Sequence, residues 1–204
     1  MELMRVGEVR IIRVTSVSDA SRWRPSFIGA YQTIFGGAPY FERFSPAEAD
    51  GVYRKLTGTP GNITLLATVG SRVVGFGIAI PLQYKADVAR QLTGLVPLER
   101  TMYLAELGVL EEYRRQGLGR VLIRERVKLV DPARYGQVVL RVSASRNVSY
   151  NQYIKMGFVD MGVYMEVKAL RTSGQVTTDR RLFLHQPLTV PEVSTDETDG
   201  AADH

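Results

Sequence analysis

The chain of 204 residues contains no cysteine and only two histidines, His185 and His204. The lack of cysteine excludes disulfide bonds, thiolate metal ligands and a cysteine nucleophile, and two histidines are too few for a histidine-rich metal site. No apolar run is long enough to cross a bilayer, and the first ten residues lack the apolar segment of a secretory signal. We therefore expect a cytoplasmic protein with no metal and no membrane partner.

Basic residues outnumber acidic ones except at the end of the chain. The net charge is +5, and it rises to +10 when the five acidic residues after Leu188 are left out. This excess favours an anionic ligand. The basic residues are scattered, so nucleic acid is not expected as a partner. The composition predicts one domain over residues 1–188 and an acidic, disordered tail over 189–204.

The most informative stretch is 114–120, Arg-Arg-Gln-Gly-Leu-Gly-Arg. It lies between 103–109, which predicts a buried strand, and 118–130, whose apolar residues recur at helical spacing. The first N–H groups of a helix have no partner inside it and carry the positive end of its dipole. Glycines 117 and 119 would let a ligand approach these donors, and the arginines add charge. A phosphate or pyrophosphate ligand is predicted here.

Two common phosphate-binding motifs do not fit this stretch. A P-loop requires Lys followed by Ser or Thr after its last glycine, whereas Arg120 and Val121 follow Gly119. A dinucleotide fingerprint requires three glycines near the first strand, whereas this stretch has two and lies past the middle of the chain.

The stretch instead resembles the signature of the Gcn5-related N-acetyltransferase (GNAT) superfamily, in which Arg or Gln is followed three residues later by Gly and two further on by Gly or Ala. Arg114, Gly117 and Gly119 match it. A second match is a predicted helix carrying Tyr153, with Gly-Phe at 157–158, four residues later. The family often has an asparagine before this helix. Its position corresponds to residue 146, which is an arginine in this chain, and Asn147 follows one residue later. The resemblance covers about residues 8–188.

The order of predicted elements is that of the family. Strands are expected at 9–14, 63–69, 73–80, 103–109, 137–143, 161–169 and 177–186. Helices are expected at 17–35, from 46 onward, at 118–130 and at 148–155, and the residues 86–92 are compatible with a further short helix. The resemblance implies an α/β (α+β) fold with a single domain. Its mixed, mostly antiparallel sheet would have seven strands, flanked by about four helices and splayed between the fourth and fifth strands. Edge strands of the terminal hairpin would allow a homodimer.

The resemblance also implies acetyl-CoA as cosubstrate, with its pyrophosphate on the glycine turn and its pantetheine arm beside the fourth strand. The residues implied in binding it are Leu107, Val109, Arg114, Arg115, Gln116, Gly117, Leu118, Gly119, Arg120 and Asn147. An amine would attack the thioester directly, without a covalent enzyme intermediate, so the protein would be an acyl-CoA-dependent N-acyltransferase.

Two residues are candidates for proton transfer. Tyr153 stands where many of these enzymes have a tyrosine general acid, although a tyrosine packed on a short helix has the same pattern. Glu106, on the predicted fourth strand, is the candidate general base, because a half-buried carboxylate has a raised pKa. Polarity of the sheet surface or a salt bridge to Arg141 is the alternative explanation for a glutamate at this position.

The expected acceptor is a primary amine of a small molecule or peptide. Two alternatives are an acetyltransferase acting on a macromolecule, such as a protein lysine, a protein N-terminus or aminoacyl-tRNA, and a non-catalytic acyl-CoA-binding sensor. Residues 31–44 and 82–100 are expected to govern acceptor choice. No recognisable motif within them names the acceptor or the acyl length.

Overall fold

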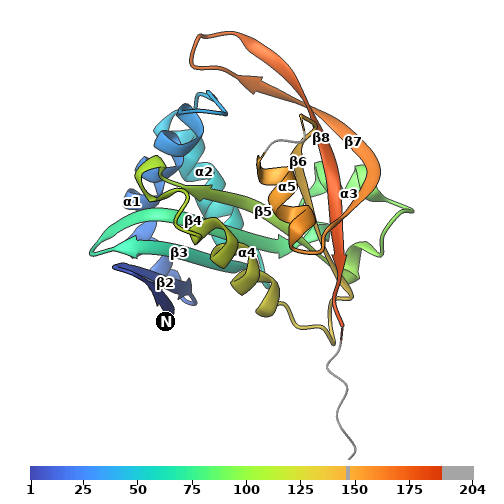
Figure 1. Ribbon diagram of the computed structural model, residues 1–204, viewed down its shortest axis with the longest axis horizontal. Coiled ribbons are helices and arrows are strands. Elements are labelled where there is room, and N and C mark those ends of the chain that lie inside the picture. The colour runs from blue at the N-terminus through green and yellow to red at the C-terminus, as the bar shows by residue number, and fades with distance from the viewer. Residues whose placement is uncertain (146–147, 190–204) are drawn as a thin grey trace, which may run out of the picture.

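The computed structural model describes residues 1–145 and 148–189, which form one mixed sheet flanked by helices (Figure 1). The strands are β1 (Glu2–Val6), β2 (Val9–Val14), β3 (Ile63–Val69), β4 (Arg72–Pro81), β5 (Thr101–Val109), β6 (Gln137–Ser143), β7 (Val159–Leu170) and β8 (Val176–Pro187). The α-helices are α1 (Val17–Gly36), α2 (Pro46–Thr57), α3 (Ala86–Leu92), α4 (Leu118–Lys128) and α5 (Val148–Lys155). The predicted disordered tail, from residue 190 on, lies outside the described residues.

The expected fold class is confirmed, with one strand more than predicted. The sheet has eight strands in the order β1-β2-β3-β4-β5-β6-β8-β7. The additional strand, β1, pairs antiparallel with β2, and Val6 lies opposite Val9 across a two-residue turn. Gly7 makes this turn possible because its φ of 58° lies in the left-handed region. All other predicted strands and helices are present within a few residues of their expected ends.

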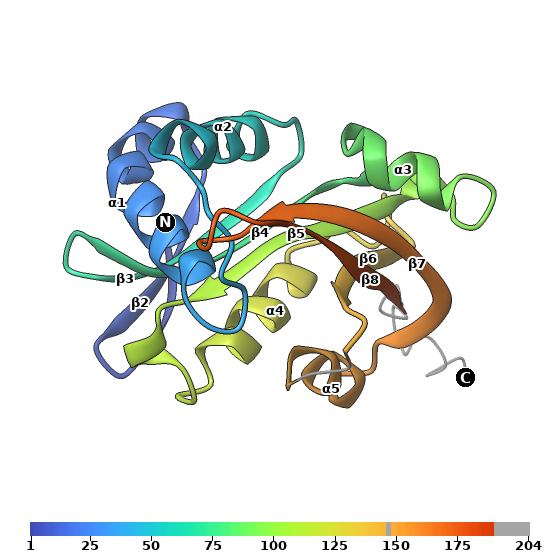
Figure 2. The ribbon, with the colours of Figure 1, turned by 90° about the horizontal axis from the view of Figure 1, so that it is seen from above.

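Helices cover both faces of the sheet. In Figure 2, α1, α2 and α3 lie on one face, and α4 and α5 lie on the other. The central strands β3 and β4 are therefore buried almost along their full length. On the α1 face the core is largely aromatic, and the rings of Phe27 and Phe76 lie 4.7 Å apart between centroids. This packing fixes α1 against the middle of the sheet.

The expected splay lies between β5 and β6. These two strands are parallel and pair only from Thr101 to Tyr103, after which β6 continues its pairing with β8. On the other edge of β5, the register with β4 shifts between Ile78 and Ala79, where β5 has one residue more than β4. Such a bulge bends a strand away from its neighbour. Beyond Tyr103, β5 has no strand partner on the β6 side among the described residues.

The β7–β8 hairpin reaches across the splay to the segment that follows α1. The N–H of Arg43 donates to the carbonyl of Leu170 at 2.7 Å, and the N–H of Thr172 donates to that of Phe41 at 2.8 Å. Glu42 and Arg171 form an isolated bridge between them. Residues 39–43 and 170–172 thus form a joined wall at one end of the splay. No helix in the described part of the chain is long and apolar enough to cross a membrane.

Candidate active site

The glycine turn at the start of α4 forms a cradle of backbone donors. Arg115 and Gly117 adopt left-handed φ angles of 60° and 82°, and the helix begins at Leu118 with no side-chain cap. In the described part of the chain, no backbone N–H from 115 to 120 donates a hydrogen bond to protein. A Cβ on Gly119 would meet only the Gln152 Nε2 atom, at 3.6 Å. The turn is therefore open, as an anion cradle requires.

Some side chains around the cradle are hydrogen-bonded to the backbone, and others are free cations. Arg114 belongs to the first group: its Nε donates to the carbonyl of Val109 at 3.0 Å and its Nη1 to that of Ala38 at 2.8 Å. Gln116 also binds the backbone, donating to Glu112 at 3.1 Å. Arg115 and Arg120 are exposed and form no ion pair with the described residues. These two arginines are the cations available to an anionic ligand.

The C-terminal half of β5 leads from the splay to the cradle. Leu107 and Val109 lie opposite Gly77 and Gly75 of β4 and are half-buried. Their other edge faces the side from which β6 has diverged. An extended chain placed there could use the open backbone groups of β5 as an added strand does. Asn147, the remaining residue implied in cofactor binding, lies outside the described residues.

Glu106 lies at the bulge, between the splay and the core. Burial raises its pKa to about 7, against the opposing effect of the nearby cations Arg141 and Lys85. The alternative of a salt bridge to Arg141 is not observed among the described residues, because Arg141 Nη1 pairs with Asp87 at 3.4 Å. A carboxyl group with this pKa can accept a proton near neutral pH.

Tyr153 points into the protein from α5 and is 6% exposed. Its ring packs edge-to-face on Phe158, with centroids 5.2 Å apart. Burial raises the pKa of the phenol, while the neighbouring Arg126 guanidinium lowers it. The phenol therefore holds its proton at neutral pH, as a general acid must. Gly157, with φ 88°, ends α5 and allows Phe158 to fold back onto it.

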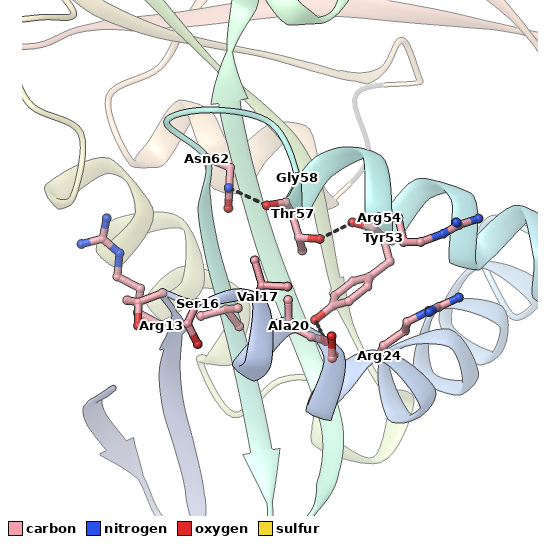
Figure 3. Close-up of a pocket in the computed structure, with 13 residues that line it drawn as sticks. Arg13, Ser16, Val17, Ala20, Arg24, Tyr53, Arg54, Thr57, Gly58 and Asn62 are labelled. Atoms are coloured by element: carbon pink, nitrogen blue, oxygen red, sulfur yellow. Dashed lines mark hydrogen bonds between the residues drawn. The ribbon is translucent and has the colours of Figure 1, made fainter.

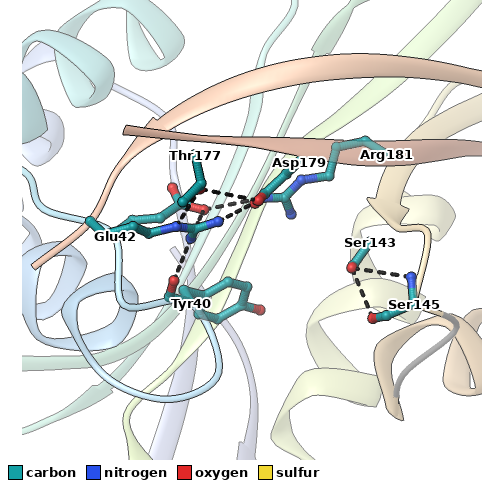
Figure 4. A network of polar contacts seen from close by, with 8 residues as sticks. Tyr40, Glu42, Ser143, Ser145, Thr177, Asp179 and Arg181 are labelled. Carbon is teal, nitrogen blue, oxygen red and sulfur yellow. Dashed lines mark hydrogen bonds and ion pairs between the residues drawn. The ribbon is translucent and has the colours of Figure 1, made fainter. Parts of the chain in front are cut away.

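A polar cavity of about 730 Å³ opens beside the joined wall. Its charged wall is a network in which Arg171 pairs with Asp179 and donates to the carbonyl of Tyr40 at 2.5 Å. Arg181 bridges Glu42 and Asp179, at 3.0 Å to each. Figure 4 shows this charged cluster, with Ser143 and Ser145 of the cavity lining apart from it. These charges lie on segments far apart in the chain, so the sequence alone does not indicate that they cluster.

A second cavity, of about 490 Å³, lies at the start of α1 (Figure 3), and its lining includes no residue of the cradle, β5 or β6. The Tyr53 hydroxyl closes part of it by donating to the carbonyl of Ala20 at 2.8 Å. Asn62 ties its rim to Thr57 with a hydrogen bond of 2.8 Å. None of the predicted site residues lines this cavity, so the candidate active site does not include it.

The comparison with protein families covers both motifs. Residues 81–173 match the family described as Acetyltransferase (GNAT) domain. Within residues 81–173, the chain is thus similar to GNAT acetyltransferase domains. The matched segment includes the cradle and Tyr153, so the resemblance expected from these residues is confirmed. No curated protein sequence matches the chain significantly.

Solved structures share the GNAT fold at low sequence identity. A phosphinothricin acetyltransferase from Sinorhizobium meliloti, in complex with AcCoA, is 19% identical with a TM-score of 0.63 and covers 95% of each chain. The ribosomal-protein-S18-alanine N-acetyltransferase from Escherichia coli is 16% identical, with a TM-score of 0.61, over 91% of this chain and 97% of its own. Arabidopsis thaliana NAA60, in complex with acetyl-CoA, is 17% identical, with a TM-score of 0.62, over 88% and 98%. The likeness shows the fold, and it leaves the acceptor open.

Proposed function

We propose that the protein transfers an acetyl group from acetyl-CoA to a primary amine of a small molecule or peptide. The observation that carries the proposal is the continuity of two features on one strand. β5 separates from β6 after Tyr103, and the chain that continues from its end presents free N–H groups from 115 to 120. One feature suits an extended arm, and the other suits a diphosphate. CoA contains both in a single molecule.

The cosubstrate would lie along β5 and end on the cradle. Its diphosphate would accept hydrogen bonds from the N–H groups of 115–120, with Arg115 and Arg120 adding charge. Its pantetheine arm would pair beside Leu107 and Val109. Two of the similar structures are complexes with acetyl-CoA, which supports this choice of cosubstrate.

The reaction needs a base on one side of the thioester and an acid on the other. Glu106 would take a proton from the acceptor ammonium, directly or through water, because its pKa of about 7 allows both protonation states. The free amine would then attack the thioester carbon, and a β5 N–H near Leu107–Val109 would stabilise the oxyanion. Collapse of this intermediate expels the CoA thiolate, which Tyr153 would protonate.

The acceptor would enter through the polar cavity beside the joined wall. Its lining carries both carboxylates and guanidinium groups, including Glu42, Asp179 and Arg181. Such a surface suits an acceptor with charged or hydrogen-bonding groups and disfavours a purely apolar amine. Peptide N-termini belong to this class. The likeness to a ribosomal-protein-alanine N-acetyltransferase favours a protein N-terminus as the second candidate acceptor.

The proposal is tested by following free thiol release from acetyl-CoA with a panel of polar small amines and short peptides, beside a CoA titration. We expect micromolar CoA binding and turnover with at least one acceptor. Absence of CoA binding at micromolar concentrations would overturn the proposal. A protein N-terminus as acceptor predicts that peptides outperform free amino acids, and an aminoacyl-tRNA acceptor predicts tRNA binding that weakens with salt.

A CoA-binding sensor would give a different pattern in the same assays. It would bind CoA with no turnover in any arm, and Tyr153→Phe and Glu106→Gln would leave its behaviour unaltered. For an enzyme, both variants should retain CoA binding and lose turnover, because neither residue belongs to the cradle.

A further inference from the structure

The cradle helix α4 carries a completely buried arginine, Arg126, that the mechanism above does not use. Its side chain is 0% exposed and is among the largest fully buried side chains of the described residues. Removing a guanidinium from water is costly unless its N–H groups find partners. A charge retained at this position therefore calls for a reason beyond packing.

Part of the guanidinium is held by backbone carbonyls at the β4–β5 bulge. Nη1 donates to the carbonyls of Ile78 at 3.1 Å and Glu106 at 2.8 Å, the pair next to the register shift. Nε donates to the carbonyl of Leu122 in its own helix at 3.1 Å. On β4, Gly77 leaves the space, since a Cβ there would lie 2.8 Å from Nε. These contacts fix the plane of the guanidinium between α4 and the sheet.

The remaining nitrogen of Arg126 is left with unused donors. Nη2 is buried and makes no hydrogen bond of 3.5 Å or less with the described residues. The phenol of Tyr153 is the neighbouring polar group: it lies within hydrogen-bonding reach of the guanidinium, which lowers the pKa of the phenol against the larger effect of burial. Buried N–H donors without a partner are rare and costly. A negatively charged phenolate oxygen would satisfy these donors better than a neutral phenol does.

We propose that Arg126 is a positioning residue for the acetyl transfer, acting through Tyr153. The inference rests on the proposed function. When the phenol protonates the departing thiolate, its O–H bond breaks, the S–H bond of CoA forms, and the negative charge moves from sulfur to the phenolate oxygen. That charge then lies beside a guanidinium already fixed in place by protein carbonyls, so little reorganisation is needed. The phenolate regains a proton from water once CoA leaves.

The test is a double-mutant cycle on kcat with Arg126→Met and Tyr153→Phe. If Arg126 acts through the phenol, R126M lowers kcat on the order of 10- to 100-fold in the wild type and by about twofold or less in the Tyr153→Phe background. CoA affinity should stay within about twofold, because Arg126 lies away from the cradle donors. Arg124→Met is the matched control: Arg124 is on the same helix but its side chain is 46% exposed, so kcat should not change.

Arg126→Lys provides a second arm, because it keeps a positive charge with fewer donors. It should recover part of the kcat lost in R126M, again only when Tyr153 is present. If R126M fails to fold by circular dichroism, the cycle is run with R126K, for which the same dependence on Tyr153 is expected. An equal loss of kcat in both backgrounds would overturn the inference and leave Arg126 a structural residue. A wild type that does not release thiol would instead refute the proposed function itself.

Discussion

Replacing Glu106 by Gln should raise the free energy of unfolding above neutral pH and lower the rate of acetyl transfer. Burial raises the pKa of this carboxyl from 4.5 to about 7 in the folded protein. The unfolded chain therefore releases the proton at lower pH than the folded protein does, and stability falls as pH rises between these values. At about 1.4 kcal/mol per pKa unit, the free energy of unfolding of the wild type should fall by on the order of 3 kcal/mol over this pH range. The free energy of unfolding of Glu106→Gln should not show this fall.

The assay is urea unfolding of the wild type and Glu106→Gln from about pH 4.5 to about pH 8.5, a range that spans both pKa values, read by circular dichroism. We expect similar free energies of unfolding at the acid end and a more stable variant at the alkaline end. In the same range, kcat/KM of the wild type should rise through about pH 7, and the variant should lose this limb and about 10²- to 10⁴-fold in rate. Parallel stability curves would refute the raised pKa, and an unchanged rate profile would refute the role as base.

Two glycines test the fold around the site. Gly117→Ala should lower the free energy of unfolding by about 1–2 kcal/mol and weaken CoA binding, because the φ of Gly117, 82°, is left-handed. Gly136→Ala is the control, because a Cβ there meets nothing within 4 Å. An unchanged CoA affinity in Gly117→Ala would contradict the cradle. Gly108→Ala should destabilise by about 1–3 kcal/mol, since its Cβ would lie 2.7 Å from Phe76 and 3.0 Å from Ile34; an unchanged melting temperature would show that this packing relaxes freely.

Features governed by neighbouring residues could be predicted from the sequence. The capping box at the start of α2 is one example, because Ser45 with Glu48 three residues later is the sequence pattern of this motif. In the structure the N–H of Glu48 donates to Ser45 Oγ at 3.2 Å, and the N–H of Ser45 donates to the Glu48 carboxylate at 2.7 Å. The cradle is another, since its glycines lie between a strand and a helix that are both evident from periodicity. β1 was not predicted, although Gly7 and its flanking valines carry a short hairpin pattern.

Features that depend on distant residues could not be predicted. Glu42 meets Arg181 from 139 residues away, and in the sequence both resemble ordinary surface charges. Arg126 is four residues after Leu122 and so shares the apolar face of α4, but the sequence does not show that the missing side chain of Gly77, on another strand, leaves room for its guanidinium. The bulge that brings Glu106 to the splay follows from one extra residue in the pairing of β4 and β5, which alternation along one strand does not reveal.

Amide chemical shifts of the ¹⁵N-labelled protein during a CoA titration test the central claim most directly, namely that the cradle and the open edge of β5 hold CoA. The largest shifts are expected at the N–H groups of 115–120 and at Leu107–Val109, with little change around the cavity at the start of α1. Saturable binding that leaves these amides unmoved, or no binding at micromolar CoA, would contradict the account.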